Sequence, residues 1–519
     1  MKYQINNFRV SPLKDNELAQ EIKARIDSNI NDFKILQKSI DARNKNNVFI
    51  NYKLMIDTPN ILKGKNISIY NDKEIELTYP KWDGLPPVIV GFGPAGMLAA
   101  LYLARCNAQP IIIERGSKIE DRRKHVNDFF KNKTLNTNSN IQFGEGGAGA
   151  FSDGKLVSNV KDPLIKYILN EFYKHGALEN IIYESKPHIG TDYLEKVVRN
   201  IRLEIESLGG KFYFEHTFLN TNKIDDKISV SISNLDECLI TKHLLLGLGH
   251  SARDTIRHLF NNMNIKMEQK AFSMGVRIEH PKDLIDESQY GEFHKYLPAA
   301  YYKLAAHYND RGIYTFCMCP GGYVLASQSE ENTIVTNGMS NNARDNLNSN
   351  SALLVDIRPS DYNKGNVLDG IDYQERYEKL AFEISGDYRA PANLVKEFLN
   401  DDIASDIRSI STSYPHGLCM TRLSRCLPDF VIEGLKYGIV EFDKKLKGFN
   451  NDDAIIIGIE SRSSSPVRIL RDDNRESSIK GIYPIGEGAG YAGGITSAAL
   501  DGLKTAMLIA KGTIKKWVN

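Results

Sequence analysis

Apolar residues follow two different spacings at the start of the chain. Residues 3–10, 33–42 and 48–56 alternate or cluster as strands do, whereas residues 15–29 carry aliphatic side chains at helical spacing. This order predicts a small N-terminal β-α-β-β unit over residues 1–83.

A strand, a glycine-rich turn, a helix and a second strand follow in immediate succession. The apolar run 88–90 precedes GFGPAG at 91–96, residues 97–105 favour a helix, and the apolar run 110–113 ends on Glu114. The turn has the form G-x-G-x-x-G, and its place between a strand and a helix is typical of a dinucleotide-binding site. Glu114 lies 18 residues after the last glycine (114 − 96), where an acid can accept hydrogen bonds from ribose hydroxyls.

Each glycine of this turn has its own expected role. Gly91 permits the tight turn, Gly93 lets the backbone approach a diphosphate, and Gly96 allows the helix to pack closely on the strand. The diphosphate is expected at the helix N-terminus, because free N–H groups and the helix dipole favour negative charge there. The alternative is a glycine-rich turn with no ligand.

The segments that follow favour FAD over NAD as the dinucleotide. A helix that starts at Thr191 has one apolar face and ends at a glycine pair, and strand-like runs follow at 211–216, 228–233 and 239–246. The last run leads to Gly249. A helix, a strand, a meander and a return strand ending in glycine correspond to the second half of an FAD-type domain.

The C-terminal segment supplies the remaining part of that domain. An apolar strand ends at Gly486 and Glu487, and Gly493 and Gly494 precede a helix over residues 495–510. The carboxylate can bind ribityl hydroxyls, and the glycine pair can bring backbone N–H groups to the flavin edge that becomes negative on reduction. The alternative is a structural helix start that happens to use glycine.

Composition narrows the class of protein. The chain has 519 residues, 41% hydrophobic and 25% charged, so a large core and more than one domain are expected. With 66 Lys+Arg against 65 Asp+Glu the net charge is +1, which does not suggest nucleic acid or an anionic membrane as partner. No apolar run reaches membrane length, and no signal-like segment follows Met1. The six Cys predict a reducing, cytoplasmic setting, and without a His/Cys cluster at zinc spacing no metal is expected.

Longer motifs give the chain a resemblance to a known family. They are SIDAR at 39–43, QFGEGGAGAFSDGK at 142–155, GHSARD at 249–254, CMCPGG at 317–322, SSPVR at 464–468 and YPIGEGAGYAGG at 483–494. With these motifs the chain resembles, over nearly its whole length, the bacterial FAD-dependent dehydrogenases usually described only as uncharacterised, within the glutathione-reductase-type flavoproteins. The resemblance implies bound FAD and redox chemistry but no substrate. Glu487 departs from the wider class, in which Asp is commoner at that strand end.

The glycine-rich run at 142–155 is expected to wrap the flavin, since backbone close to a ring or a diphosphate favours residues without side chains. Ser152 and Lys155 are the polar groups expected near the ring, with Lys155 able to stabilise an anionic reduced flavin; a flexible surface loop is the alternative. Arg122 resembles the family arginine that neutralises the diphosphate or ribose region, or else is an exposed helix residue. The full expected cofactor-binding set is Gly91, Gly93, Pro94, Ala95, Gly96, Glu114, Arg115, Arg122, Gly146, Gly147, Ser152, Lys155, Gly249, Gly486, Glu487, Gly493, Gly494 and Ile495.

Four residues are candidates for a catalytic role: Lys155, His250, Arg462 and Arg468. His250 lines the expected domain junction or caps a helix there. Arg462 or Arg468 is expected to orient an anionic substrate or the flavin pyrimidine edge, or else to lie in an exposed charged loop. Although 247–252 reads G-x-G-x-x-A, no second βαβ unit follows, so no dedicated NAD(P)H domain is expected.

Two cysteines lie in a hairpin-like part of the expected second domain, between strands at 314–316, 323–326 and 333–336. On a strand Cys317 and Cys319 would share one face. A pair of small apolar residues near the flavin is the favoured interpretation, and a redox-active dithiol is the alternative.

The predicted fold class is α/β. A Rossmann-like, doubly wound FAD-binding domain with a β-meander (84–255 and 452–519) carries an inserted mixed α/β substrate domain (256–451) and follows the small N-terminal domain. The expected function is hydride transfer between bound FAD and a small organic substrate, with NADH or NADPH as an open choice of transient electron donor. Two alternatives are an FAD-dependent RNA-modifying enzyme and a binding protein that retains FAD without turnover.

Overall fold

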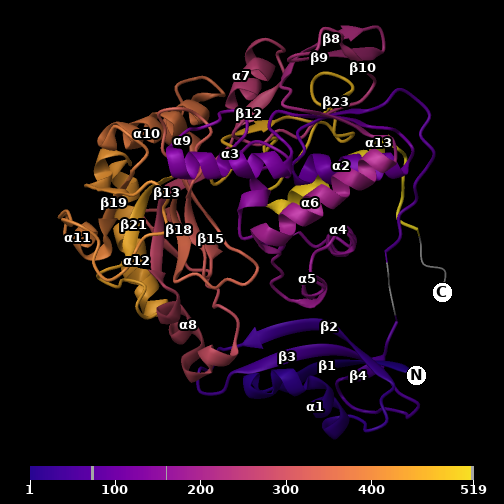
Figure 1. Ribbon diagram of the computed structural model, residues 1–519, viewed down its shortest axis with the longest axis vertical. Helices are drawn as coiled ribbons and strands as arrows, with labels where there is room; N and C mark the ends of the chain where they lie inside the picture. Colours follow the sequence, from indigo (N-terminus) through magenta and orange to yellow (C-terminus); the bar gives the residue numbers. More distant parts are fainter. Residues whose placement is uncertain (72–74, 159, 516–519) are drawn as a thin grey trace.

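The computed structural model describes residues 1–71, 75–158 and 160–515. It is a mixed α/β protein with several sheets (Figure 1). In that view the N-terminal unit lies at the bottom, a large sheet with its helices lies at the left, and helices that cover a second sheet lie at the centre.

The N-terminal unit has the predicted β-α-β-β order. Its elements are β1 (Lys2–Val10), η1 (Pro12–Glu17), α1 (Leu18–Arg25), β2 (Asp32–Asp41), β3 (Phe49–Asp57) and β4 (Ile67–Ile69), and the sheet order is β2-β3-β1-β4. Alternate residues of β1 and β3 pack against Leu18 and Ile22 of α1. The helix is shorter than predicted, because Pro12 and the cap from Ser11 make the preceding turn a 3-10 helix.

A five-stranded parallel sheet positions the glycine-rich turns. Its strands are β5 (Val88–Val90), β6 (Ile111–Glu114), β7 (Lys211–Phe214), β11 (Leu244–Leu246) and β23 (Ile482–Pro484), in the order β23-β11-β5-β6-β7. Parallel strands bring all their carboxyl ends to one edge, where ligands of open α/β sheets bind.

Alternate residues of the parallel strands enter two different cores. Ile89 and Leu245 pack under the helices α2 (Pro94–Arg105), α6 (Gly190–Ser207) and α13 (Ile495–Ile509). Their neighbours in the same strands pack on the opposite face against α7 (Arg253–Asn261) and the β-meander. The parallel sheet is therefore the middle one of three layers.

The predicted meander is present with one strand more than the sequence indicated. It consists of β8 (Phe218–Ile224), β9 (Lys227–Ile232) and β10 (Leu239–Thr241). The run 239–246 is not one strand, because it leaves the meander after Thr241 and enters the parallel sheet as β11. Strand β8 was not predicted because most of its residues are polar and give no apolar strand pattern.

A seven-stranded mixed sheet forms the core of the second large unit. Its strands, in spatial order, are β14 (Ala305–Tyr308), β15 (Arg311–Cys319), β18 (Asn348–Ile357), β13 (Phe272–Pro281), β21 (Ile455–Glu460), β19 (Ala390–Leu394) and β20 (Leu418–Met420). Strand β21 lies within the segment predicted to belong to the FAD domain, but it pairs with β13 and β19 in this sheet. Helices α10 (Asp369–Ser385) and α12 (Asp429–Lys445) pack on it.

Short elements connect these layers. They are α3 (Ile119–Asn132), η2 (Ala148–Phe151), α4 (Leu164–Lys174), α5 (Asn180–Tyr183), α7 (Arg253–Asn261), β12 (Met267–Gln269), α8 (Lys282–Tyr290), η3 (Gly291–Tyr296), β16 (Tyr323–Ala326), β17 (Thr336–Met339), α9 (Pro359–Tyr362), α11 (Val395–Leu399), η4 (Leu423–Arg425) and β22 (Val467–Ile469). The strand expected at 333–336 thus begins where that range ends. In the described residues no helix has both the length and the apolar character needed to cross a membrane.

Candidate functional site

Three glycine-bearing segments that are far apart in the sequence meet at the carboxyl edge of the parallel sheet. The Gly146 N–H donates to the carbonyl of Phe92 in the first turn (2.9 Å). Gly149 lies so close to Ile495, the first residue of α13, that a Cβ atom there would be 3.1 Å from the Ile495 side chain. The Thr496 hydroxyl donates to the carbonyl of Leu156 (2.8 Å). The turn after β5, the run 142–155 and the start of α13 therefore form one site.

Two glycines of the first turn have the predicted steric roles. Gly91 has a φ of +91°, and a Cβ atom there would lie 2.5 Å from the carbonyl oxygen of Gly247. A Cβ atom at Gly96 would lie 2.0 Å from the carbonyl oxygen of Gly91, which confirms that this glycine lets α2 pack closely on the turn. Both positions exclude any larger residue.

Four other glycines face open space, which is what a site for an extended ligand requires. A Cβ atom at Gly249, Gly493 or Gly494 would have no neighbour within 4 Å, and at Gly93 only the Cα of Gly147 would be in contact, at 3.7 Å. Gly93 and Gly494 are also the residues that cap the N-termini of α2 and α13. The backbone there forms a cradle that side chains would fill, and two helix N-termini point their free N–H groups into it.

The first turn of α2 is fixed against the end of β23. Pro94 is the first residue of the helix, and the Ala95 methyl group leaves no room for a Cβ atom at Gly486 (2.8 Å). The Gly486 N–H donates to the carboxylate of Asp501 in α13 (2.8 Å). The two glycine turns at Gly93 and Gly486 are thereby held side by side.

Glu114 joins two of the glycine segments through its carboxylate. It accepts hydrogen bonds from the N–H groups of Phe92 (2.8 Å), Gly116 (3.0 Å) and Gly144 (3.0 Å). A carboxylate has about four acceptor positions, so roughly one is left for a ribose hydroxyl. Positioning of the loops is the role that the structure assigns to this residue.

Arg122 supports the backbone of the glycine-rich run and does not reach the cradle. The sequence had predicted that it contacts the cofactor. Its side chain is fully buried and donates to the main-chain carbonyls of Asn140, Ile141, Glu145 and Gly147, at 2.7 to 2.9 Å. A Cβ atom at Gly144 would be 2.4 Å from this side chain. Burial lowers the pKa of Arg122 to about 10, so the guanidinium keeps its charge at neutral pH.

Arg115 is held at the rim of the site. Its guanidinium lies over the ring of Phe143, 4.6 Å from the centroid, and donates to the carboxylate of Asp254 (2.8 Å) and the hydroxyl of Thr255 (2.8 Å). These contacts connect the end of β6 to the first turn of α7.

Ser152 and Lys155 end the glycine-rich run with different contacts. The Ser152 hydroxyl donates to the carbonyl of Gly149 (2.8 Å) and accepts from the N–H of Gly154, so it closes a local turn. The Lys155 ammonium donates to the carbonyl of Met318 and pairs with Asp153 (3.1 Å). Burial alone would lower the pKa of Lys155, but Asp153 and the nearby thiols of Cys319 and Cys317 outweigh it and raise the pKa. Lys155 therefore carries a permanent positive charge in the site.

His250 and Glu487 lie together at the opposite end of the cradle. The His250 Nδ1 and the Glu487 carboxylate are 3.7 Å apart. Burial, followed by the charges of Arg462 and Arg253, lowers the pKa of His250 to about 3, so the ring is neutral and this contact is not an ion pair at neutral pH. Burial also raises the pKa of Glu487 to about 7, against the opposing effect of Lys270. No motif in the sequence had identified Lys270 as a residue of the site.

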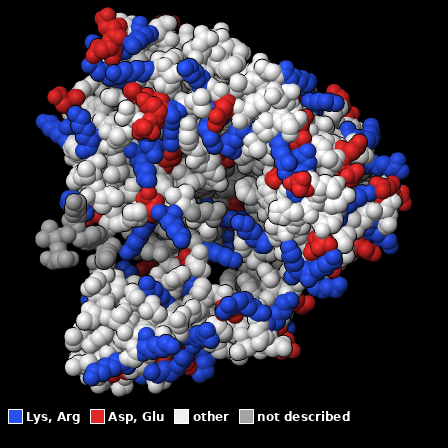
Figure 2. Space-filling view, turned by 180° about the vertical axis from the view of Figure 1, so that it is seen from behind, with Lys and Arg blue, Asp and Glu red and all other residues white. Residues whose placement is uncertain are grey.

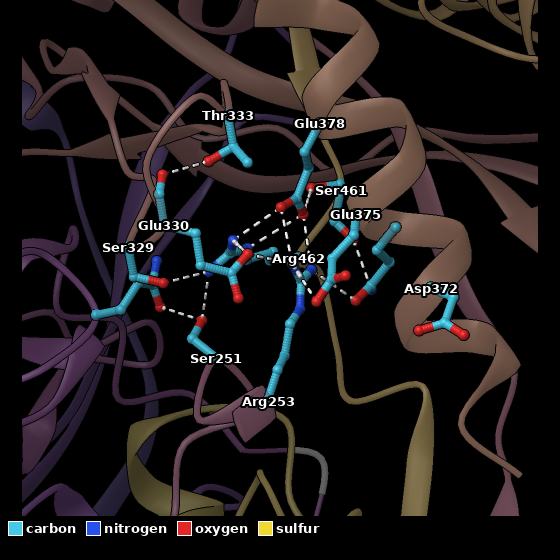
Figure 3. Close-up of polar contacts among 12 residues, drawn as sticks. Ser251, Arg253, Ser329, Glu330, Thr333, Asp372, Glu375, Glu378, Ser461 and Arg462 are labelled. Atoms are coloured by element: carbon cyan, nitrogen blue, oxygen red, sulfur yellow. Dashed lines mark hydrogen bonds and ion pairs between the residues drawn. The ribbon is translucent and has the colours of Figure 1, made fainter. Parts of the chain in front are cut away.

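Arg462 does not face the cradle but belongs to a buried charge network (Figure 3). Arg462 and Arg253 both donate to Glu378 of α10, with shortest distances of 2.8 Å, and Glu330 lies at the solvent side of the pair. Arg462 also donates to Ser251 (3.1 Å) and Ser329 (2.7 Å). The network joins the start of α7 to the seven-stranded unit, so its arginines hold the two large units together.

Arg468 packs against the C-terminal glycine motif, where a Cβ atom at Gly490 would lie 3.0 Å from the Arg468 Cβ and its guanidinium lies 5.6 Å from the centroid of the Tyr491 ring. It pairs with Glu268 (2.9 Å) across the two strands β12 and β22, and both side chains are partly exposed. Of the four catalytic candidates, Lys155 and His250 border the cradle, Arg468 packs beside its C-terminal segment, and Arg462 belongs to the buried charge network.

Cys317 and Cys319 do not share a face of β15. The pairing of β15 with β18 shifts between Phe316 and Cys319, and Cys317 has a φ of +38°. Cys317 is exposed as a result, whereas Cys319 is buried beside the guanidinium of Arg277. A bulge therefore separates the two thiols. All six cysteines of the chain are free thiols.

A hydrogen-bonded chain that sequence reasoning missed connects the glycine-rich run to the second unit. The Gln142 amide donates to the Ser327 hydroxyl (2.6 Å) and accepts from the Ser251 hydroxyl (3.1 Å), which in turn accepts from Arg462. Ser and Gln are common surface residues, so only their burial identifies them.

Comparison with known families matches two parts of the chain. Residues 271–463 match the family described as FAD-dependent protein, C-terminal domain-like, and residues 2–57 match a domain of unknown function (DUF8436). The first match ends three residues after β21, in agreement with the pairing of that strand in the seven-stranded sheet.

The chain is 44% identical to an uncharacterized protein of Clostridium beijerinckii, over 98% of each chain. Solved structures resemble it much more distantly. The tetracycline destructase Tet(51) is 11% identical over 83% of this chain and 81% of that chain, with a TM-score of 0.34. The halogenase PltM is 9% identical over 82% and 68%, with a TM-score of 0.37, and a flavoprotein/dehydrogenase from Cytophaga hutchinsonii is 12% identical over 82% and 78%, with a TM-score of 0.31.

Proposed function

Because the chain belongs to the same family as the Clostridium beijerinckii protein, and because its residues 271–463 match an FAD-dependent family, we propose that it is an FAD-dependent oxidoreductase that acts on a small organic molecule. The cofactor is FAD. The observation that carries the proposal is the open backbone cradle at Gly93, Gly249, Gly493 and Gly494, because it leaves room for an extended ligand beside the N-termini of α2 and α13.

The residues present suit an FAD molecule along this edge. The N-terminus of α2 would hold the diphosphate, with Gly93 leaving room for it, and Glu487 lies where it can accept from ribityl hydroxyls. The N-terminus of α13 and the ammonium of Lys155 would lie near the flavin ring, since Thr496 binds Leu156 next to Lys155. FAD, when bound, supplies two-electron redox chemistry.

The domain arrangement follows from the same proposal. Residues 84–255 and the segment from about β22 to the C-terminus form the FAD-binding domain. Residues 256–451 together with β21 form the substrate domain, and residues 1–83 form the N-terminal domain. The predicted boundary at 452 thereby moves to the end of β21, near Glu460.

Lys155 is the residue that we assign to charge stabilisation at the ring. Its raised pKa keeps it protonated, and the N–H groups at the start of α13 add to the positive potential. A fixed positive charge favours the reduced, more negative form of a flavin and thereby raises the reduction potential.

A purified preparation tests the proposal directly. We expect flavin absorption bands, release of FAD rather than FMN, and reversible bleaching by dithionite under anaerobic conditions, with NADH and NADPH tested as donors. In Lys155→Met we expect the two-electron reduction potential to fall by about 30 to 60 mV, which corresponds to one or two tenfold steps in the equilibrium. Lys155→Arg should retain the wild-type potential within about 10 mV. A flavin that no donor bleaches would contradict the enzyme assignment.

Glu487 makes the affinity for FAD depend on pH. Its pKa of about 7 means that the carboxyl is neutral below neutral pH and becomes a carboxylate above it. Because the ionised carboxylate is the stronger acceptor for the ribityl hydroxyls, the dissociation constant of FAD should fall roughly threefold to tenfold between pH 6 and pH 8. The Glu487→Gln variant should show a flat profile, whereas Glu268→Gln, which changes an exposed residue, should keep the slope. An equal slope in wild type and Glu487→Gln would assign the titration to another group.

A further inference from the structure

A group of polar side chains surrounds Lys155, and apart from Lys155 itself the proposed FAD site does not use them. We call this group the lysine cluster and define it as Asp153, Lys155, Lys186, His188, Tyr301 and Arg344. The ammonium groups of Lys155 and Lys186 both lie over the ring of Tyr301, 5.6 and 4.7 Å from its centroid. Arg344 donates to the Asp153 carboxylate (3.0 Å), which also pairs with Lys155 (3.1 Å).

The lysine cluster holds more positive than negative charge. Asp153 is shared by two cations, Lys155 and Arg344. Within the described ranges the Lys186 ammonium has no carboxylate partner, and burial is the one cause that acts on its pKa. Within the cluster three cations, Lys155, Lys186 and Arg344, stand against one carboxylate, Asp153, so its net charge is positive, and partial burial lowers the pKa of Lys186.

His188 adds an unused hydrogen-bond acceptor next to these cations. It is the β-bridge partner of Lys155, so the two side chains leave the backbone on the same side. Its Nε2 donates to the carbonyl of Asn342 (3.2 Å). Burial, and then the charge of Arg344, lowers the His188 pKa to about 4, so the ring is neutral and Nδ1 carries a free lone pair. That Nδ1 atom is buried without a partner.

The N-terminal unit holds two of the segments that carry the lysine cluster. The N–H of Ser185, next to Lys186, donates to the carbonyl of Lys38 in β2 (2.9 Å). Leu297, four residues before Tyr301, packs against the core of the N-terminal unit. Figure 2 shows Lys and Arg side chains gathered around a hollow where this unit meets the rest of the molecule. Two segments of the cluster therefore lie against the N-terminal unit.

We propose that the lysine cluster binds an organic anion that carries a hydroxyl group close to its charge. Lys186 and the remaining donor of Lys155 pair with the anion, and the Nδ1 of His188 accepts a hydrogen bond from the hydroxyl. This substrate class rests on the proposed function, because it places the hydroxyl-bearing carbon beside the lysine assigned to the flavin ring. A carboxylate and a phosphate monoester satisfy the same charge.

Calorimetric titration of the FAD-loaded protein with four probes tests the proposal. Mandelate carries a carboxylate and a hydroxyl, phenylacetate only the carboxylate, benzyl alcohol only the hydroxyl, and phenyl phosphate the other anion. We expect mandelate, or phenyl phosphate if the anion is a phosphate, to bind at least about tenfold more tightly than benzyl alcohol. Mandelate should bind about threefold to tenfold more tightly than phenylacetate.

Variants connect this binding to named residues. In Lys186→Met the affinity for mandelate should fall at least about tenfold, whereas Lys186→Arg should stay within about threefold of wild type. In His188→Leu mandelate and phenylacetate should bind equally. The exposed Lys174 of α4 provides the matched control, and Lys174→Met should bind the probes as wild type does.

The FAD content, measured by absorbance in the same samples, separates this proposal from the proposed function. Anion binding by a preparation that takes up no FAD would support the anion site and contradict the proposed oxidoreductase function. Equal affinity for benzyl alcohol and mandelate, or unchanged mandelate affinity in Lys186→Met, would overturn the anion site. Neither result would contradict the proposed oxidoreductase function. Suppose instead that the wild-type protein binds none of the probes and that Lys186→Met loses FAD. The positive charge of the cluster would then serve the cofactor, and the anion site would be overturned.

Discussion

Gly93→Val should weaken FAD binding at least about 100-fold, a loss of about 2.7 kcal/mol. Gly93 is the residue before α2, and a Cβ atom there projects into the cradle with only the Cα of Gly147 nearby, at 3.7 Å. The two methyl groups of valine would occupy the space left for the diphosphate and shield the first N–H groups of the helix. Equilibrium dialysis or fluorescence titration of the apoprotein with FAD measures the effect.

This variant is informative because the apoprotein should remain folded. The backbone of Gly93 has a φ of −77° and a ψ of −178°, which valine adopts readily. Replacing a glycine cap should change the free energy of unfolding by no more than about 1 kcal/mol. Gly64→Val is a matched control, since its nearest neighbour is the flexible end of Ile67 in the N-terminal unit. Wild-type FAD affinity in Gly93→Val would place the diphosphate elsewhere.

Glu378→Ala should lower the free energy of unfolding by about 3 to 5 kcal/mol. Glu378 is fully buried and accepts hydrogen bonds from Arg253, Arg462 and the Ser461 hydroxyl. Removal of the carboxylate leaves two buried guanidinium groups, with the partly exposed Glu330 and the more distant Glu375 to balance them. Urea unfolding of the apoprotein, followed by circular dichroism, measures the change.

The same carboxylate gives this effect a pH dependence. Burial alone would raise the pKa of Glu378, but Arg253 and Arg462 outweigh it and hold the pKa well below its ordinary value of 4.5. A depressed pKa contributes stability above the unfolded-state value and loses it as pH falls, so the difference between wild type and Glu378→Ala should shrink below about pH 4.5. Glu268→Ala removes an exposed partner of Arg468 and should cost no more than about 1 kcal/mol. Equal losses in the two variants would contradict the structural role of the buried network.

Local sterics made the first glycine turn predictable from sequence. Gly91 and Gly96 are required by contacts with residues of the same strand–turn–helix unit or its neighbouring strand, and such contacts repeat wherever this unit occurs. The order of elements in the N-terminal unit and along the parallel sheet was predictable for the same reason. Convergence of the three glycine segments followed from parallel strands ending at one edge.

Long-range pairing explains the sequence-based predictions that were wrong. Arg122 and Arg462 looked like ligand-binding arginines, but their partners are carbonyls and carboxylates that only the folded chain brings near. Strand β21 was placed in the wrong sheet because its apolar pattern suits either one, and its partner β13 lies far away in sequence. The bulge that separates Cys317 from Cys319 depends on the register against β18, which no local pattern encodes.

Backbone hydrogen exchange with and without FAD tests most directly whether one FAD molecule lies against all three glycine segments. FAD should slow exchange together in residues 91–97, 144–156 and 493–498, at one equivalent per chain, and the meander strand β8 should exchange equally in both samples. Slowed exchange in only one of these segments, or no difference between the two samples, would contradict a shared site at the edge of the parallel sheet.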